Sequence, residues 1–252
     1  MRSILFFLPT LYCFGFNTHR HLGELTENAL DSSILHKIKA IIGNESLYNA
    51  SIWADQVKYT KEYYWSKQLH YLDIQECPLS KLTDAIVNKY CKNKCIFAAL
   101  MNFTSILKNS DKIGSGEGYS LKFLLHFMQD FNQPMHLLGY SHGGNGDTLI
   151  VSRNGRNRTI NLHAFWDTYI PEYFIKNYEY KYNGKVTKIT DMSEYKEFLM
   201  NILDMNQKLA CKVYPGKQQY IIFEEYYKAE ILVMLFDNYL TLAISTFKFI
   251  FN

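Results

Sequence analysis

The stretch LKFLLHFMQD, residues 121–130, combines a helical apolar pattern with a histidine and an aspartate. Its apolar residues recur at helical spacing, and the pattern runs to Gln133, before Pro134 removes a backbone donor and ends or kinks the helix. His126 and Asp130 lie four residues apart in this apolar helix, so both face one side and can present a nitrogen and an oxygen to one metal ion. An unpaired charge there would cost several kcal/mol, which indicates that a partner compensates it.

A second pair, His163 and Asp167, repeats this spacing among Leu162, Phe165 and Trp166. With 8 histidines and 24 acidic residues in 252, chance alone produces about one such pair, so the spacing by itself proves little. Two interpretations remain open from the residues alone. The pairs are either metal ligands or buried histidines that hydrogen-bond to a core acid.

Helical apolar spacing continues along the chain, with no repeat, low-complexity tract or linker. It covers residues 22–42, 79–107, 119–133, 162–174, 192–209 and 223–251. Strand-like segments at 148–152 and 158–162 flank Asn154-Gly155, a pair typical of a tight hairpin turn. With 48% hydrophobic residues and few Pro and Gly, the chain is predicted to be all-α: a single multi-helix domain over residues 14–252 with one small β-hairpin.

Two function classes are disfavoured by charge and hydropathy. The formal net charge of +3 is far from the dense basic surface that coats duplex DNA. Residues 231–251 are apolar enough to suggest a membrane anchor, but Asp237, Asn238 and Lys248 interrupt them. We therefore predict a core helix and no membrane span in the mature chain.

The N-terminus resembles a short signal peptide, residues 1–13, with Arg2 followed by an apolar run at residues 4–8. The alternative is a buried N-terminal helix. Such a signal peptide would direct the chain into the secretory pathway. Its cleavage after Cys13 would make Phe14 the first mature residue.

The cysteines that remain after cleavage are an even set, as expected in an oxidising compartment. Three pairings are possible; Cys91 and Cys95 are close enough to clip a short loop, which leaves Cys77 and Cys211 as a long-range link. A zinc site made of these cysteines is the rival interpretation. Acceptors for N-glycosylation at Asn44, Asn49, Asn102 and Asn157 fit the same secretory route.

Several segments together resemble one known family. They are Phe14-Gly15, His19-Arg20, Leu22-Gly23, Trp53-Ala54-Asp55, Leu69-His70-Tyr71-Leu72-Asp73, the run from His126 to His136, Gly143-Gly144-Asn145, Asn161-Leu162-His163 and Trp166-Asp167. In this order they resemble the class I nucleases of moulds and plants, which are secreted, zinc-dependent and single-strand-specific. The family is related in fold to the zinc-dependent phospholipases C. The resemblance covers nearly the whole mature chain and implies an all-α fold with a cleft that binds three zinc ions.

The resemblance also implies which residues hold the metals. One zinc would be held by Asp55, His70, His126 and Asp130, a second by Asp130, His19 and the amine and carbonyl of Phe14, and a third by His136, His163 and Asp167. The cysteine pairing above matches the family pattern.

One departure from the family is the first mature residue, which is usually Trp and here is Phe14. Phe16 and His21 have the same separation as Phe14 and His19, so a shifted register is an alternative. We prefer His19, because the Gly that follows Phe14 fits only that register.

The resemblance assigns the chemistry as follows. Asp55 would orient the attacking water, Lys58 would neutralise the phosphoryl charge, and Tyr71, Asp73 and Asn145 would bind the substrate. Hydrolysis of single-stranded DNA and RNA to 5′-phosphorylated products is the implied activity, together with 3′-nucleotidase activity. A monomer without a stable protein partner is expected.

Two other functions remain as alternatives. A zinc-dependent phospholipase C shares the ligand order, but Asp167 and the hairpin before His163 disfavour it. A secreted metal scavenger without catalysis would require a lost nucleophile or a blocked cleft, for which the sequence shows no sign.

Overall fold

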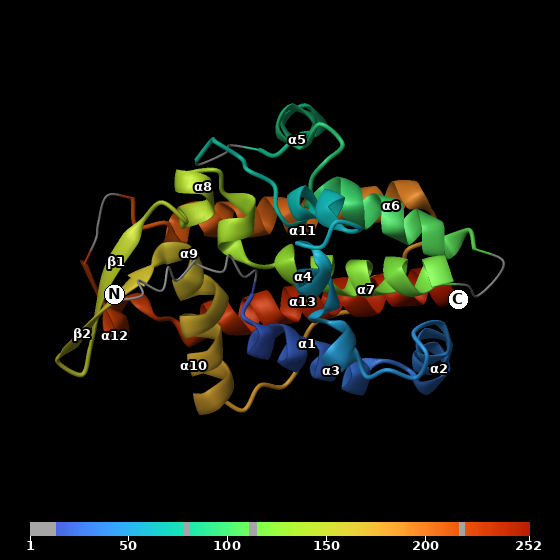
Figure 1. Cartoon of the computed structure of the whole chain (residues 1–252), viewed down its shortest axis with the longest axis horizontal. Coiled ribbons are helices and arrows are strands. Elements are labelled where there is room, and N and C mark those ends of the chain that lie inside the picture. The colour runs from blue at the N-terminus through green and yellow to red at the C-terminus, as the bar shows by residue number, and fades with distance from the viewer. Residues whose placement is uncertain (1–13, 78–80, 111–114, 217–219) are drawn as a thin grey trace, which may run out of the picture.

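The structure, a computed structural model, describes residues 14–77, 81–110, 115–216 and 220–252. The predicted signal peptide, residues 1–13, and Leu79 at the start of one predicted helix lie outside the described residues. The prediction of an all-α fold is confirmed, with helices packed around one core and a small sheet at one end (Figure 1).

The first half of the chain contributes α1 (Phe16–Ala29), α2 (Ser32–Ile41), α3 (Leu47–Ala50), α4 (Trp53–Val57), the 3₁₀ helix η1 (Tyr64–His70), α5 (Asp84–Cys91), α6 (Ile96–Lys108) and α7 (Ser115–Asp130). The 3₁₀ turn η2 (Pro134–Leu137), the turn α8 (Ser141–Gly144), β1 (Thr148–Arg153) and β2 (Arg156–Asn161) follow. The chain then forms α9 (Leu162–Ala164), the π-helical turn η3 (Phe165–Tyr169) and α10 (Ile170–Asn177). It ends with α11 (Met192–Val213), β3 (Tyr220–Ile222), α12 (Phe223–Tyr226) and α13 (Ala229–Phe251).

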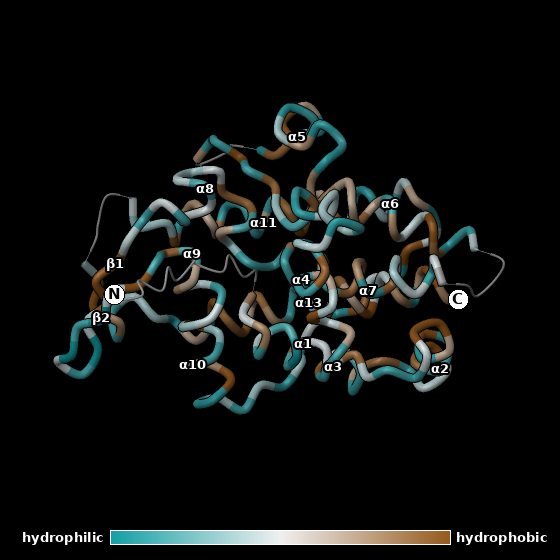
Figure 2. The backbone as a smooth tube through the Cα atoms, in the orientation of Figure 1, coloured by the Kyte–Doolittle hydropathy of each residue, from teal (hydrophilic) through white to brown (hydrophobic). Residues whose placement is uncertain are grey.

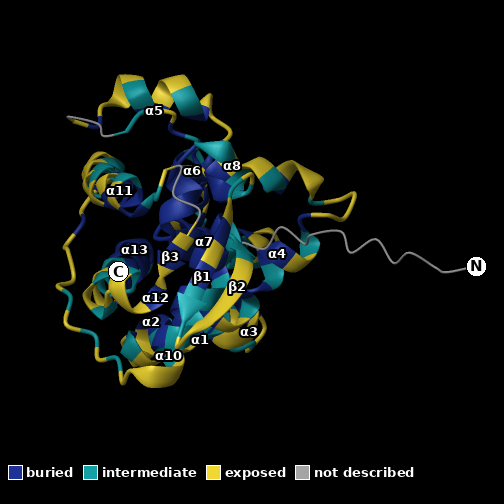
Figure 3. Ribbon diagram, turned by 90° about the vertical axis from the view of Figure 1, so that its left-hand side faces the viewer, coloured by how far each residue is buried: buried dark blue, intermediate teal, exposed yellow. Residues whose placement is uncertain are grey.

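Helix α7 lies in the centre of the molecule. It packs against α1, α2, α3, α4, α6 and α13, and Figure 3 shows α6, α7 and α13 as the buried interior. Phe103 of α6 and Phe127 of α7 both stack on Phe123, with ring centroids 5.4 Å apart in each pair. The apolar periodicity of α7 is therefore satisfied on all sides, which holds its His and Asp rigidly.

Helices α1 and α3 approach closely at Gly23. A Cβ on Gly23 would lie 2.2 Å from Ser51 Oγ and 2.3 Å from Leu47 O, so a larger residue would push the helices apart. The contact places the Ser51 carbonyl beside α7, where it accepts a hydrogen bond from His126.

Three helices predicted as continuous are interrupted, which corrects the prediction. Residues 22–42 form α1 and α2, because the backbone is extended at Leu30 and Asp31, and the Asp31 carboxylate pairs there with Lys248 of α13 at 3.0 Å. Residues 79–107 break into α5 and α6 at Lys92 and Asn93, which have left-handed backbone conformations. Residues 223–251 also divide, into α12 and α13.

The predicted hairpin is present, but it belongs to a larger sheet. β1 and β2 pair antiparallel from Thr148 opposite Asn161 to Arg153 opposite Arg156, and Asn154 and Gly155 have φ of 50° and 72°. This is the two-residue turn that the Asn-Gly pair predicts. The unpredicted strand β3 pairs parallel with β1, and the hairpin tip is hydrophilic in Figure 2.

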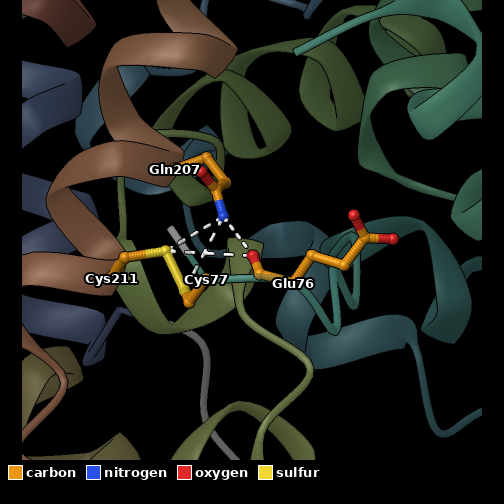
Figure 4. Close-up of a disulfide and its surroundings, with 4 residues drawn as sticks. All are labelled: Glu76, Cys77, Gln207 and Cys211. Carbon is orange, nitrogen blue, oxygen red and sulfur yellow. Dashed lines mark hydrogen bonds between the residues drawn. A yellow bond between two sulfur atoms is a disulfide. The ribbon is translucent and has the colours of Figure 1, made fainter. Parts of the chain in front are cut away.

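Both expected disulfides are present. Cys91 and Cys95 close the turn between α5 and α6, and Cys77–Cys211 joins the segment before α5 to α11 across 134 residues. Gln207 donates from its amide to Glu76 O at 2.9 Å beside the long-range disulfide (Figure 4). The zinc interpretation of these four cysteines is therefore wrong.

Helix α13 is long and apolar enough to cross a membrane by length and composition alone. However, 61% of its most apolar window is buried, and its residues pack against α1, α2, α6, α7, α10 and α11. This burial is what a core helix requires, as the sequence predicted.

Candidate functional site

The carboxylate of Asp130, at the end of α7, lies at the centre of a buried cluster of histidines and acids. Its Oδ2 is 2.8 Å from His70 Nδ1 and 3.1 Å from His126 Nε2. Its Oδ1 is 3.4 Å from His19 Nε2 and 3.6 Å from His136 Nδ1. Each oxygen thus faces a different pair of histidines, so this carboxylate is shaped to serve two neighbouring positions.

Asp55 of α4 closes the cluster from the opposite side. Its Oδ1 is 3.5 Å from His126 Nε2 and accepts a hydrogen bond from Lys58 Nζ at 2.7 Å. His19 Nε2 is 3.9 Å from Asp55 Oδ2. Donor atoms of His19, Asp55 and His126, and of His70, His126 and Asp130, form two groups that could each hold a metal ion.

A third group lies beside the first two. His163 Nε2 is 3.2 Å from Asp167 Oδ2, and His136 Nε2 is 3.6 Å from Asp167 Oδ1. Asp167 sits in the π-helical turn η3 rather than in the α-helix that its spacing from His163 predicted. Such wider turns recur at functional sites, because the extra residue re-aims a side chain without ending the helix.

Four of these histidines are oriented by a hydrogen bond between Nδ1 and an oxygen atom of the protein. The acceptors are Gln129 Oε1 for His19, Ser51 O for His126 at 2.6 Å, His70 O for His136 at 2.9 Å, and Gly143 O for His163 at 2.7 Å. With Nδ1–H donating outward, each Nε2 is directed at the cluster and can bind a metal ion once it carries no proton, as in metal-bound histidines.

The acceptor for His163 comes from a strained turn. Ser141, His142, Gly143 and Gly144 all have φ between 47° and 78°, which is costly for the two residues that carry a Cβ. A Cβ on Gly143 would lie 2.6 Å from Met135 O, so only glycine fits between η2 and His163. The Gly-Gly pair in the sequence therefore serves to position a histidine.

The charges of the cluster are strongly coupled. Burial works against the charged forms of Asp55 and Asp130, yet the nearby His126 holds the pKa of both carboxyls well below the usual range. Burial likewise opposes the charge on His126, but Asp130 and Asp55 raise its pKa to about 10. Burial, aided by Lys58, lowers the pKa of His70 to about 3. The site therefore keeps anionic oxygens that attract a cation.

Several polar atoms in the cluster are buried without a hydrogen-bond partner among the described residues. They are His19 Nε2, Asp55 Oδ2, Asp130 Oδ1, His136 Nε2 and Asp167 Oδ2. Orphaned buried atoms are costly unless something else satisfies them. His19 Nε2 lies 3.4 Å from Asp130 Oδ1 and 3.9 Å from Asp55 Oδ2, and nitrogen and oxygen donors of this kind suit zinc at a catalytic site. The residues present therefore fit a bound metal cluster.

His19, not His21, enters the cluster. The imidazole of His21 is partly exposed and lies 3.9 Å from Glu24, near Phe236. The ring of Phe14 is 2% exposed and meets the His19 ring edge-on at 5.8 Å. The Gly15 amide donates to Asp167 O at 2.8 Å, which ties the start of the described chain to the third group.

A cleft of about 450 Å³ opens onto the cluster. Four residues assigned from the resemblance line it: Lys58, Tyr71, Asp73 and Asn145. Lys58 is only 5% exposed, which excludes a solvated surface side chain. Burial raises the pKa of Asp73, against the lowering influence of His142 and His136. Tyr71 is 39% exposed at the mouth of the cleft.

Sequence reasoning missed four cleft residues: Tyr59, Lys67, Met135 and His142. It also missed the buried amides that support the ligands, Gln129 for His19 and Gln133, which donates to Asp167. Both glutamines lie within three residues of Asp130, in a run whose side chains are all buried. Uncompensated polar residues on a buried helix face were the signal that could have found them.

Comparison with known proteins agrees with this geometry. A family model described as S1/P1 Nuclease matches residues 14–241. Nuclease S1 of Aspergillus oryzae is 33% identical over 165 residues, which cover 64% of this chain and 55% of that protein. Nuclease P1 of Penicillium citrinum is 33% identical over 140 residues, covering 54% and 50% of the two chains. Endonuclease 1 of Arabidopsis thaliana is 28% identical over 240 residues, covering 84% and 78%. The matches to Nuclease S1 and Nuclease P1 thus span about half the length of those relatives.

Proposed function

This chain belongs to the S1/P1 nuclease family, and we propose that it is a secreted, zinc-dependent endonuclease. Its substrates are single-stranded DNA and RNA, cleaved to 5′-phosphorylated products, and it also removes 3′-phosphates from nucleotides. The observation that carries the proposal is the convergence of three His/Asp groups beside one cleft.

Three zinc ions are the proposed cofactor. Asp55, His70, His126 and Asp130 would hold the first; Asp130, His19 and the terminal amine and carbonyl of Phe14 the second; and His136, His163 and Asp167 the third. The distances between Asp130 and four histidines support its role as the shared ligand. When bound, such ions lower the pKa of water and neutralise charge on phosphoryl oxygens.

Asp55 and Lys58 carry the proposed chemistry around the phosphodiester. The Asp55 carboxylate accepts a hydrogen bond from the attacking water and so orients it. The Lys58 ammonium group, 2.7 Å from Asp55 Oδ1, lines the cleft. A fixed cation there stabilises the negative charge that develops on the phosphoryl oxygens. Its burial makes this contribution larger than that of a solvated lysine.

The proposed base site is formed by Tyr71, Asp73 and Asn145 on the wall of the cleft. A ring can stack on a base, and a carboxyl and an amide can hydrogen-bond to the base edge. Both contacts need an unpaired base, which is the reason for the proposed single-strand preference.

Secretion is supported by the two disulfides, which persist in oxidising compartments. All four predicted glycosylation acceptors are exposed, so each could carry a glycan. We propose that the mature chain begins at Phe14 and acts as a monomer.

The test is to incubate purified protein that begins at Phe14 with single-stranded DNA, RNA and phosphatidylcholine in separate reactions. We expect hydrolysis of both nucleic acids, with 5′-phosphates on the products, and no release of phosphocholine. The nuclease family match favours this outcome over the phospholipase alternative. Hydrolysis of phosphatidylcholine alone would overturn the proposal, and binding of zinc without any hydrolysis would indicate a metal scavenger.

A further inference from the structure

We propose that residues 59–67 form a strand-binding surface, which holds nucleotides of the substrate that extend beyond the cleft. The proposal rests on the nuclease function proposed above and adds a second contact region to it. Its residues are Tyr59, Tyr64, Trp65 and Lys67.

Both ends of this segment are anchored in the metal cluster. It begins directly after Lys58, which is bound to Asp55, and it leads through η1 into His70, which lies 2.8 Å from Asp130. Lys58 and His70 are 5% and 2% exposed. The residues between them therefore loop out from the cluster, and Tyr59 and Lys67 line the cleft. The strand-binding surface is continuous with the cleft.

Exposed aromatic rings are concentrated on this segment. Tyr59, Tyr64 and Trp65 are 51%, 60% and 55% exposed. Among the described residues, eight aromatic side chains are more than a third exposed, and these three lie within seven consecutive positions. Leaving large rings in water forgoes the stabilisation of burial, so a cluster of them indicates a surface that meets a partner.

The ammonium group of Lys67 lies close to two of these rings. Lys67 Nζ lies 4.8 Å from the ring centroid of Tyr59 and 4.7 Å from that of Tyr64. Through Lys67, the ring of Tyr64 is brought next to the wall of the cleft. Lys61 adds an exposed cation to the half-buried Lys67, and Glu62 is the one acid within residues 59–67.

Aromatic rings beside ammonium groups match the two parts of an unpaired nucleotide. Its base can stack on a ring, and its phosphate can pair with a cation. A duplex offers its phosphates and the edges of its bases, but no free base face for stacking, because its bases are already stacked on one another. The surface therefore fits single strands, and its place next to the cleft assigns it to nucleotides that flank the cleaved bond.

The proposal predicts that activity depends on substrate length through Tyr64. Tyr64→Ala is expected to lower kcat/KM about tenfold on an oligothymidylate of about twelve nucleotides, mainly by raising KM. Hydrolysis of a dinucleotide, which under this proposal is held by the cleft alone, is expected to change less than about twofold. Tyr64→Phe keeps the ring and is expected to restore the activity on the longer substrate.

Tyr48→Ala is the matched control. Tyr48 is 42% exposed and carries Arg20 over its ring at 5.3 Å, but it lies on α3 and does not line the cleft. It is expected to behave as wild type on both substrates. Equal losses for Tyr64→Ala on the two substrates, or no loss on either, would overturn the proposed surface.

A binding measurement separates this proposal from the proposed function. Fluorescence anisotropy with a hydrolysis-resistant phosphorothioate oligothymidylate measures strand binding without requiring cleavage. If the wild type binds this strand but cleaves neither substrate, only the nuclease proposal is overturned. Weaker binding by Tyr64→Ala, but not by Tyr64→Phe or Tyr48→Ala, supports the surface. Equal binding by all variants refutes it.

Discussion

Replacing Asp130 by Asn tests the centre of the proposed metal cluster. The change keeps the shape of the side chain but removes its charge and replaces one oxygen by an NH₂ group, which has no lone pair for a metal. Because Oδ1 faces His19 and His136 while Oδ2 faces His70 and His126, an amide can serve only one of the two sides. At least one ion is expected to be lost.

The expected size of this effect follows from the burial of Asp130. The Asp130 side chain is fully buried, and breaking a buried charged contact costs about 3–5 kcal/mol. This corresponds to a loss of about 100-fold to 5000-fold in metal affinity or in transition-state stabilisation. Initial rates on single-stranded DNA and zinc content by elemental analysis measure it, and circular dichroism checks that the helical fold persists.

Asp84→Asn is the control for this prediction. Asp84 is an exposed acid that pairs with Lys196 at 2.8 Å, a contact of the kind that contributes about 0–1 kcal/mol. It is expected to retain full zinc content and activity. If Asp130→Asn also kept its zinc and stayed within about tenfold of the wild-type rate, the assignment of Asp130 as the shared ligand would be refuted.

Four further predictions address the metals and the framework. Elemental analysis of protein beginning at Phe14 is expected to find about three zinc ions per chain, and one or none would contradict the cluster. An extra residue before Phe14 turns the terminal amine into an amide, so we expect less zinc and cleavage slower by about tenfold or more; equal activity of the two forms would exclude the amine as a ligand. Gln129→Ala removes the acceptor that orients His19 and is expected to weaken metal binding about 10-fold to 100-fold, and unchanged affinity in a zinc titration would contradict this role. Removing the Cys77–Cys211 disulfide, which closes a loop of 134 residues, should cost about 5 kcal/mol of unfolding free energy. Removing the short disulfide should cost about 2 kcal/mol, and urea unfolding that ranks the two in the opposite order would refute this reasoning.

Local patterns predicted the secondary structure where one rule acted alone. The apolar spacing of α7, the Asn-Gly turn and the length of α11 all depend on residues close in sequence. The prediction was wrong where a distant contact competed with the local pattern. The chain is extended between α1 and α2, where Asp31 pairs with Lys248 of the distant α13, and the short strand β3 pairs with β1.

The residues of the candidate site also divide into those that the sequence predicted and those that depend on distant contacts. The two His/Asp pairs could be found from their spacing, and the resemblance to class I nucleases supplied the other ligand positions. Neither identified Ser51 O, Gln129 or Gly143 O as the acceptors that orient the histidines. These contacts cross 20 to 110 residues of sequence, and two of the three use a backbone carbonyl, which leaves no residue type to recognise.

Residue types and short-range patterns were enough to predict most of the helices, the Asn-Gly hairpin and the two His/Asp pairs, because helical period, turn chemistry and ligand chemistry act over short distances or through residue type. They favoured a link between Cys91 and Cys95 but left three pairings of the four cysteines possible. The tertiary structure was needed to show that Lys58 is buried against Asp55 and that Tyr64 stands near the cleft, and it places His19, the histidine preferred from the sequence, in the cluster. These outcomes depend on how helices pack, and packing is a property of the whole core rather than of any segment.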